Sequence, residues 1–270
     1  MTNVIESGAT ATGAAVSRAE VCVVACADAF RDNGEILASA FGTIPAIGAR
    51  LARLTFSPDL LISDGEAYLM RGVWPVGAPA TGEIEAWAPF RTIFDLVWHG
   101  KRHVMMIPSQ VDRYGNTNIS AIGDYRRPKV QLLGVSGAPG NTVCHPTSYW
   151  VPRHSTRVFV PRVDMVSGVG TDRAAEAGPA ASRYHDLRRI VTNLAVFGIH
   201  PELGTLRLLS VHPGVTVEQV RAATGFPLDV DDDVPQSRLP SDEELRLIRE
   251  VLDPRGLRDK EVPDDAAAGK

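Results

Sequence analysis

The chain has 270 residues, of which 44% are hydrophobic and 22% charged, and its formal net charge is -4. This composition is typical of a folded globular protein, and it provides no strongly cationic surface for the phosphates of a nucleic acid. We therefore expect no nucleic-acid partner.

The cysteine pattern indicates a reducing compartment and no metal site. Cys22, Cys26 and Cys144 cannot all pair with one another, and their spacing matches no repeated ligand motif. Cys22 and Cys26 lie one helical turn apart and are interpreted as small apolar residues of a helix. The apolar run around them, 21–30, is too short to span a membrane. We therefore expect a cytoplasmic protein without a membrane segment.

The chain is expected to form one large domain between two less ordered ends. Residues 1–16 are rich in Ala, Gly and Thr and lack periodicity, which predicts a disordered lead-in. We expect an α/β domain over residues 17–256 and a flexible tail over residues 257–270.

The domain opens with a helix, a strand and a second helix. Ser17 and Glu20 form a capping-box pattern, and the helix that they start is expected to run to Phe30. The run 35–42 predicts a strand, and Thr43 begins the second helix.

Strands and helices continue to alternate through the middle of the chain. The short apolar run 59–63 is typical of a strand that is covered on both faces. It is followed by a helix at 90–99, a strand at 103–107 and a strand at 130–134. This order predicts an α/β protein with a three-layer open sheet whose strands are mainly parallel.

The last third of the chain changes character. The runs 188–199 and 205–214 are strand-like, and the turn residues 201–204 separate them, which predicts an antiparallel strand pair near the C-terminus. Two further capping boxes predict short helices. They are Thr216 with Gln219, and Ser241 with Glu244.

Three loops that follow predicted strands are the candidate sites, because ligands of open α/β sheets bind beyond the carboxyl ends of the strands. The first loop holds Asp64 and Glu66 on either side of a glycine. The second covers residues 108–118, and the third covers residues 134–141.

The third loop is rich in glycine. Gly134, Gly137 and Gly140 allow backbone N–H groups to approach an anionic atom, as an oxyanion hole or a phosphate cradle requires. An ordinary surface turn has the same composition. The loop lacks both the Lys-Ser/Thr pair of a P-loop and the spacing of a dinucleotide-binding motif, which argues against nucleotide binding.

Asp64 is the candidate catalytic side chain of the first loop. A carboxylate at the end of a buried strand can act as a base or as a nucleophile. The alternative is that Asp64 only caps the turn through a hydrogen bond to the backbone. Glu66, taken by itself, is interpreted as a solvated or ion-paired side chain.

The histidines predict neither a metal site nor a catalytic triad. His99 and His103 are four residues apart, but Gly100 between them should end the helix that would bring them together. No Gly-x-Ser-x-Gly sequence carries a nucleophilic serine.

Taken together, the motifs of this chain resemble those of the β subunit of class I coenzyme A transferases. The segment 110–120, "QVDRYGNTNIS", looks like the family's Gln-Val-Asp-x-x-Gly-Asn sequence, and 134–141 takes the place of its glycine-rich loop. The segments 191–199 and 212–226 are similar to its C-terminal signature. The resemblance extends over about residues 18–230.

This resemblance implies a Rossmann-like coenzyme A transferase fold, an acyl-CoA substrate and a partner. The partner is a coenzyme A transferase-like α subunit, expected in an α2β2 assembly. Coenzyme A enters as part of the substrate, and no other cofactor and no metal are expected. The resemblance assigns catalysis to Asp64, and substrate or coenzyme A binding to Glu66, Gln110, Arg113, Asn116, Gly134, Ser136, Gly137, Gly140 and Asn141.

One departure from the family pattern changes the expected reaction. The transferases carry a nucleophilic Glu at the position of Asp64, whose carboxylate is withdrawn by about 1.5 Å, one C–C bond. Attack geometry tolerates such an error poorly, which argues against coenzyme A transfer. The segments 63–72 and 82–95 are instead most similar to the branch of actinobacterial steroid ring-opening hydrolases, β subunits that serve C–C bond hydrolysis.

Three hypotheses therefore remain. The first is a subunit of a hydrolase that opens a ring of a steroid-derived coenzyme A thioester. The second is an authentic coenzyme A transferase that uses Asp64 or Glu66. The third is a non-catalytic subunit that shapes the cleft while the other subunit supplies the general base.

Overall fold

A central sheet of eight strands organises the chain. The structure, a computed structural model, describes residues 15–62, 68–89 and 91–263. The strand order of the sheet is β14-β13-β12-β11-β10-β5-β1-β2. The bounds are β1 Leu37–Ala40, β2 Leu61–Ile62, β5 Arg102–Met106, β10 Pro146–Val151, β11 Asp186–Thr192, β12 Ala195–Ile199, β13 Leu206–Val211 and β14 Asp229–Val230.

The pairing confirms the predicted fold class. Strands β2, β1, β5, β10 and β11 pair in parallel, and β13 pairs in parallel with β14. Strand β12 is antiparallel to both of its neighbours, β11 and β13, as predicted for the end of the chain. The run 188–199, predicted as one strand, is two, because the chain reverses between β11 and β12.

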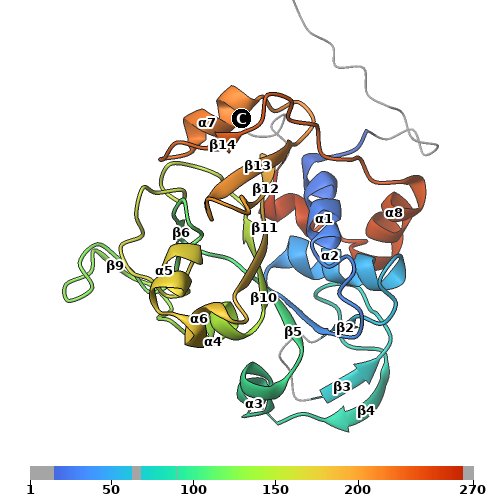
Figure 1. Cartoon of the computed structure of the whole chain (residues 1–270). Helices are drawn as coiled ribbons and strands as arrows, with labels where there is room; N and C mark the ends of the chain where they lie inside the picture. Colours follow the sequence, from blue (N-terminus) through green and yellow to red (C-terminus); the bar gives the residue numbers. More distant parts are fainter. Residues whose placement is uncertain (1–14, 63–67, 90, 264–270) are drawn as a thin grey trace, which may run out of the picture.

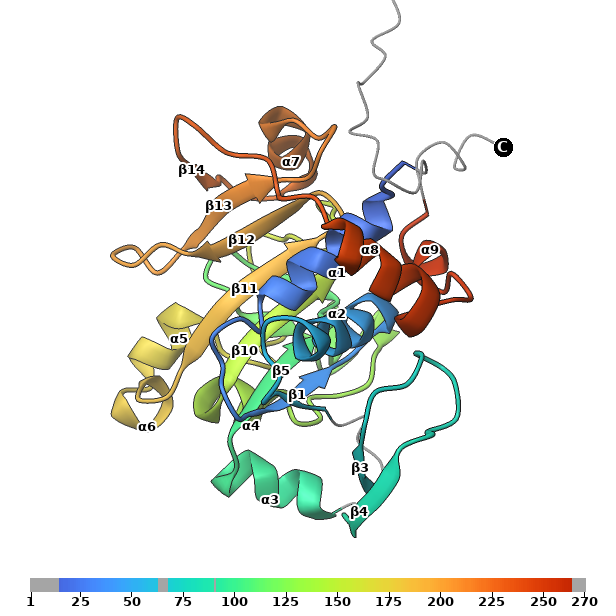
Figure 2. The same ribbon diagram turned by 90° about the vertical axis from the view of Figure 1, so that its right-hand side faces the viewer.

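Helices cover both faces of this sheet, which gives the predicted three layers. Figures 1 and 2 show α1, α2 and the C-terminal helices on one face, and α4, α5 and α6 on the other. The bounds are α1 Arg18–Asp28, α2 Thr43–Leu54, α3 Arg91–His99, α4 Ala138–Cys144, α5 Thr171–Glu176, α6 Pro179–Ser182, α7 Val217–Ala223, α8 Asp242–Arg246, the π-helix η1 Leu247–Leu252 and α9 Arg258–Glu261.

Three small two-stranded sheets complete the fold. They are β3 Tyr68–Arg71 with β4 Glu83–Trp87, β6 Gln110–Val111 with β7 Thr117–Asn118, and β8 Ala121–Ile122 with β9 Val130–Gln131. Neither the β3–β4 hairpin nor strand β10 of the central sheet was predicted from the sequence.

The capping boxes form where the sequence predicts them. The Ser17 side chain accepts from the Glu20 N–H, and the Glu20 carboxylate accepts from the Ser17 N–H. The equivalent pairs open α7 and α8. Each box satisfies N–H groups that have no partner within the helix, so the start of a helix is set locally.

Two apolar cores lie on the two faces of the sheet. Neighbouring residues of β10 point in opposite directions, so Trp150 belongs to the core under α1 and α2, and Tyr149 to the other core. Cys22 and Cys26 are fully buried in the first core, as predicted for small apolar helix residues. No helix within the described ranges is long and apolar enough to cross a membrane.

Two predicted strands differ from the structure. The run 59–63 was expected to be covered on both faces, but β2 has two residues at the sheet edge, and Leu61 is 45% exposed. The run 130–134 was expected as a buried strand, but β9 pairs only with β8, and Leu133 is 91% exposed. Both runs are apolar, and their neighbours in space, not their composition, decide how far they are buried.

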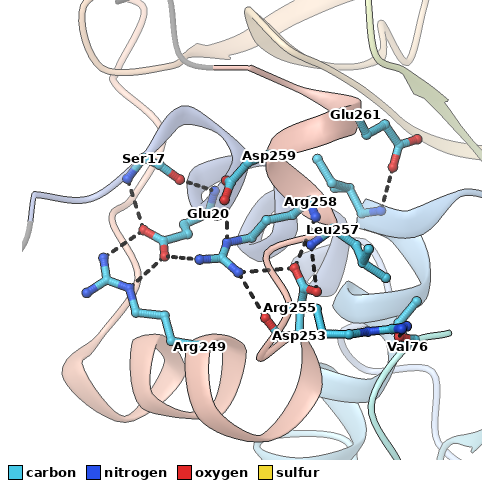
Figure 3. A network of polar contacts seen from close by, with 11 residues as sticks. Ser17, Glu20, Val76, Arg249, Asp253, Arg255, Leu257, Arg258, Asp259 and Glu261 are labelled. Carbon is cyan, nitrogen blue, oxygen red and sulfur yellow. Dashed lines mark hydrogen bonds and ion pairs between the residues drawn. The ribbon is translucent and has the colours of Figure 1, made fainter. Parts of the chain in front are cut away.

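The C-terminal segment is ordered further than predicted. Residues 257–263 were expected to belong to a flexible tail, but they contain α9, and its Arg258 is buried. Figure 3 shows the reason, because Arg258 forms ion pairs with Asp253 and with Glu20 of α1, each at 3.1 Å. Arg249 approaches the same Glu20 carboxylate at 2.7 Å.

This network holds a buried carboxylate in its charged form. Glu20 is 1% exposed, and burial by itself raises the pKa of its carboxyl group. The hydrogen bond from Arg249, the Ser17 N–H and the charge of Arg258 outweigh burial, so the pKa lies below the usual value. The network therefore joins α1 to α9, the first and the last helix of the described residues.

Burial keeps histidines of the folded chain neutral, as three of them show clearly. His103 lies between Asn33 and Ser148, at 3.0 and 2.9 Å from their side chains. Burial lowers the pKa of His103 and of His154 to about 3, and that of His212 to about 4. Protonation of these rings therefore accompanies unfolding in acid.

We expect the free energy of unfolding to fall as the pH is lowered from 6.5 towards 4. The unfolded chain binds protons at His103, His154 and His212 that the folded chain does not, so this stability is present in full above pH 6.5 and is lost towards the folded pKa values. Each ring contributes up to about 1.4 kcal/mol per pH unit.

Chemical denaturation between about pH 7.5 and 5 measures this dependence. His212→Gln should reduce the slope, whereas His99→Gln, at an exposed position of α3, is the matched control. A stability that does not change over this range contradicts the assignment.

Candidate active site

The predicted catalytic segment follows β2 at the edge of the sheet. Ile62 is the last described residue before it and pairs in parallel with Ala38 of β1. Asp64 and Glu66 lie outside the described residues, so their roles stay predictions. The described part of the site is the surface around the carboxyl ends of the neighbouring strands.

Two apolar side chains lie at the carboxyl ends of β1 and β5. Phe41 is 50% exposed and Ile107 is 36% exposed. Gly42 has φ 99°, and a Cβ there would lie 2.9 Å from Cδ1 of Ile107, so a side chain at this position would collide with the end of β5. The two strands therefore end close together and leave apolar surface at the predicted site.

Glu261 of α9 reaches the same region from the other end of the chain. Its Oε2 accepts from the Ile44 N–H at 2.8 Å, and its Oε1 accepts from the Trp150 indole N–H at 2.9 Å. This carboxylate satisfies a free N–H group in the first turn of α2 and joins that turn to β10. Figure 3 shows Glu261 at the edge of the network around Arg258.

The glycine-rich loop does not follow a strand of the central sheet, which corrects the prediction. It leaves the small β8–β9 hairpin and leads into α4. Gly134 and Ser136 have left-handed backbone conformations, with φ 90° and 47°. Gly137, immediately before α4, has an ordinary φ of -84°. The loop is therefore a tight turn over the start of a helix.

The three glycines of this loop differ in what they tolerate. A Cβ on Gly140 would lie 2.6 Å from Cγ1 of Val97, so this glycine allows α4 to pack against α3. A Cβ on Gly137 would meet only Asn141, in ordinary contact at 3.4 Å from Nδ2. Gly134 has open space around it. Gly137 is thus the position where a side chain disturbs the fold least.

Asn141 lies beside Gly137 and is bound to a buried arginine. Its Oδ1 accepts from Nη1 of Arg102 at 2.9 Å, and Nε of Arg102 donates to Oγ of Ser39 at 2.9 Å. Arg102 is 6% exposed, and burial lowers the pKa of its guanidinium group. Helix α4 is therefore tied through Arg102 to the paired strands β5 and β1.

In the second predicted loop, polar side chains form hydrogen bonds with other residues of the same chain. Oε1 of Gln110 accepts from the Asp164 N–H at 3.0 Å and from Nδ2 of Asn118 at 2.7 Å. Nε2 of Gln110 donates to the Asp164 carboxylate at 3.0 Å. These bonds fix the segment 162–166 against β6.

Asn116 is held in the same way, whereas Arg113 is exposed. Nδ2 of Asn116 donates to the Asp172 carboxylate at 2.8 Å, and its Oδ1 accepts from the Gly170 N–H at 2.7 Å. The guanidinium of Arg113 lies 4.8 Å from the centre of the Tyr114 ring. Substrate binding by Gln110, Arg113 and Asn116 stays a prediction.

The segment 167–170 joins the second loop to the third. The Val169 N–H donates to Oγ1 of Thr142 in α4 at 3.1 Å, and the Gly168 N–H donates to the Thr117 carbonyl at 3.1 Å. The structure thus connects both loops through hydrogen bonds, on the face of the sheet opposite α1 and α2. The described residues contain no group of three or more His, Cys, Asp or Glu side chains placed to bind a metal ion.

Comparison with known proteins identifies the family to which this fold belongs. The family described as coenzyme A transferase matches residues 20–223, which is most of the chain. This chain belongs to the coenzyme A transferase family. The expectation drawn from the three loops and the C-terminal signature is therefore confirmed.

Relatives within the coenzyme A transferase family cover nearly the whole chain. The cholesterol ring-cleaving hydrolase IpdB subunit of Rhodococcus jostii (strain RHA1) is 56% identical over 92% of this chain and 96% of that protein. The subunit of the same name from Mycobacterium tuberculosis (strain ATCC 25618 / H37Rv) is 51% identical over 91% of this chain and 98% of that protein.

A solved structure agrees with these relatives. The crystal structure of Rhodococcus jostii RHA1 IpdAB matches with a TM-score of 0.87 and 55% identity, over 92% of this chain and 98% of that chain. The fold and the sequence therefore point to the same members of the coenzyme A transferase family.

Three polar residues around the candidate site of this coenzyme A transferase fold were not predicted from the sequence. They are Ser39, Arg102 and Glu261. A signal for Arg102 exists in the alternation of β5, because Arg102 shares a strand face with the buried Val104 and Met106. A charged residue at an inward-facing position predicts a buried polar contact. Glu261 has no such signal, because α9 is too short to show periodicity.

We expect Gly137→Val to reduce turnover of the coenzyme A ester far more than stability. The new side chain would crowd the N–H groups of the loop, and the loss of one oxyanion donor lowers kcat by a factor of about 100 to 1000. Steady-state kinetics and the Tm of the same preparation measure both quantities.

Gly140→Ala is the contrasting variant for this prediction. Its Cβ meets Val97, so it should lower the Tm. If folded Gly137→Val kept the kcat of the parent protein, the loop would have no part in the reaction.

Proposed function

We propose that this chain is the β subunit of a heteromeric hydrolase that opens a ring of a steroid-derived coenzyme A thioester in sterol degradation. The observation that supports this proposal is the identity of more than half of all aligned residues with two subunits named for cholesterol ring cleavage. The alignments extend over almost the full length of both proteins, so the likeness covers the whole subunit.

The proposed reaction is the hydrolytic cleavage of a C–C bond. Water adds to a ring ketone, and the bond between the former carbonyl carbon and its ring neighbour breaks. The carbonyl carbon becomes a carboxylate, and the electron pair stays on the neighbouring carbon until that carbon takes up a proton. Delocalising this pair onto an adjacent carbonyl oxygen creates a negative charge, which N–H donors of the loop 134–141 would stabilise.

Asp64 has a polar and not a nucleophilic role in this proposal. It replaces the Glu of the transferases and orders water or substrate through its carboxylate. The general base is then Asp64 itself or a group of the partner subunit. If the base belongs to the partner, this chain shapes the cleft and supplies the loop.

The proposed partner is a coenzyme A transferase-like α subunit, in an α2β2 assembly. Large apolar side chains are exposed together on β4 and α3, which lie next to each other in Figure 1. Trp87 is 70% exposed and Trp98 is 76% exposed, and Ile84 and Phe94 are more than half exposed. Exposed apolar surface of this extent marks an interaction site, and we assign it to the α subunit.

The enzyme is proposed to act in the cytoplasm and to need no resident cofactor. Burial raises the pKa of the Cys22 and Cys26 thiols, which keeps them protonated and unreactive, as suits small core residues. The acyl-CoA substrate brings the only coenzyme. The net charge of -4 supports the absence of a nucleic-acid partner.

We expect activity only from the co-expressed pair of subunits. Expressed alone, the chain would leave the apolar surface of β4 and α3 exposed, and it should aggregate or stay inactive. Size-exclusion chromatography and an acyl-CoA assay of the single chain and of the pair test this. A single chain that matches the rate of the pair would contradict the heteromer.

We expect no covalent enzyme–coenzyme A thioester to form during turnover. The assembled enzyme is incubated with substrate and borohydride, and the intact mass of each subunit is then measured. An authentic transferase would be reduced at its nucleophile and inactivated, whereas this chain should keep its native mass.

Two outcomes would change the mechanism. A modified Asp64 or Glu66 peptide, together with exchange of coenzyme A between two acids, favours the transferase hypothesis. Full activity of Asp64→Ala without any adduct leaves hydrolysis in place and assigns the base to the α subunit.

A further inference from the structure

Arg102 is a buried cation whose described partners are all neutral. It donates to the Ser39 hydroxyl and to the Asn141 carbonyl oxygen, and no carboxylate within the described ranges forms an ion pair with it. An arginine buried without an acid loses the hydration of its charge and gains no opposite charge in return. Such a residue does not contribute favourably to the free energy of folding, so its presence needs another explanation.

Arg258, a buried arginine of the opposite layer, shows the contrast. Arg258 is 9% exposed and is paired with the carboxylates of Asp253 and Glu20. The guanidinium of Arg258 is therefore neutralised twice over, whereas that of Arg102 has no described acid beside it. The difference points to a negative charge that reaches Arg102 only during the reaction.

The guanidinium group also fixes the orientation of the Asn141 amide. Arginine can only donate, so the atom of Asn141 that faces Nη1 must be the carbonyl oxygen. The amide nitrogen then points the other way, towards Gly137 and the sulfur of Met106, which accepts from it at 3.7 Å. A thioether is a weak acceptor, so an N–H group of Asn141 stays available beside the loop.

We propose that Arg102 is a positioning residue of the reaction, which turns the amide N–H of Asn141 towards the glycine-rich loop and places a positive charge behind it. The negative charge that develops on a substrate oxygen at this loop meets a donor whose direction is set before the substrate binds. Because the donor cannot rotate freely, little reorganisation is needed when the charge appears. This inference rests on the proposed function for the identity of that oxygen.

Asn141→Asp is the first test, because it separates stability from turnover. The new carboxylate can pair with Arg102, so the complex should stay folded with an unchanged or higher Tm. It removes the N–H donor and neutralises the charge behind it, so kcat should fall by about 100-fold or more. KM should change only a few-fold, because the contact matters when charge develops.

Arg102 is tested by two variants of different charge. Arg102→Met removes the charge and frees the Asn141 amide, so kcat should fall by about 10- to 100-fold. Arg102→Lys keeps the charge at the same place and should recover most of that loss. The double variant Arg102→Met/Asn141→Asp should be no slower than the slower single variant, because the two residues act as a unit.

The control is Arg249→Met, which removes an arginine of the opposite layer. It breaks the ion pair with Glu20 and should lower the Tm while leaving kcat and KM unchanged. All variants are assayed as assembled complexes, and co-elution of the two subunits is checked first. If Arg102→Met fails to fold, the kcat of the folded Asn141→Asp complex alone tests the inference.

A folded Asn141→Asp or Arg102→Met complex with the kcat of the parent protein overturns the inference. A parent protein that exchanges coenzyme A between acids and does not open a steroid ring overturns the proposed function instead. The same ratios of kcat are then measured in the exchange reaction, which also places negative charge on a substrate oxygen. The two failures are therefore distinguishable.

Discussion

The parallel pairing of β1, β5 and β10 is the constraint on which the rest of the structure depends. Its register places Ser39 and Thr147 on either side of Val104, so their side chains share one face of the sheet. Arg102, two residues earlier on β5, shares that face, and Oγ1 of Thr147 donates to the Asn141 carbonyl at 3.2 Å. A shift of one residue would turn all these groups to the other core.

Buried charges on the two faces of the sheet include one that is neutralised by ion pairs and one that is not. On the side of α1 and α2, Glu20 is bound by two arginines, so the charges are satisfied within the chain (Figure 3). On the side of α4, Arg102 has neutral partners. The first arrangement holds helices together, whereas the second retains an electrostatic potential that a bound molecule can use. The contrast gives the Glu20 network a structural role and leaves Arg102 as a charge that the reaction can use.

Capping boxes, which depend on neighbouring residues, predicted the structure more reliably than apolar runs, which depend on burial. The capping boxes at Ser17, Thr216 and Ser241 were predicted correctly, because each depends on residues three apart. The edge position of 59–63 and the separation of 130–134 from the central sheet were not, because both depend on which distant strands lie alongside. An apolar run has the same composition at a sheet edge as at its centre.

The candidate site shows the same division. The glycine-rich loop was found by its composition, but the packing of α4, into which it leads, against α3 depends on the contact between Gly140 and Val97. Besides partners within the loop, Gln110 and Asn116 bind Asp164 and Asp172, each more than fifty residues further along the chain. No pattern within the loops indicates such distant partners. The sequence therefore predicted the loop residues but not the hydrogen bonds that fix them.

The contact between Glu20 and Arg258 joins residues that are 238 positions apart, at the two ends of the domain. During synthesis the first helix leaves the ribosome long before the arginines that neutralise its buried carboxylate exist. The layer of α1 and α2 can therefore close only after the last helix has been made. Until then the Glu20 charge lacks both of its arginine partners, so this layer gains its last stabilising contacts only when the C-terminal helices fold.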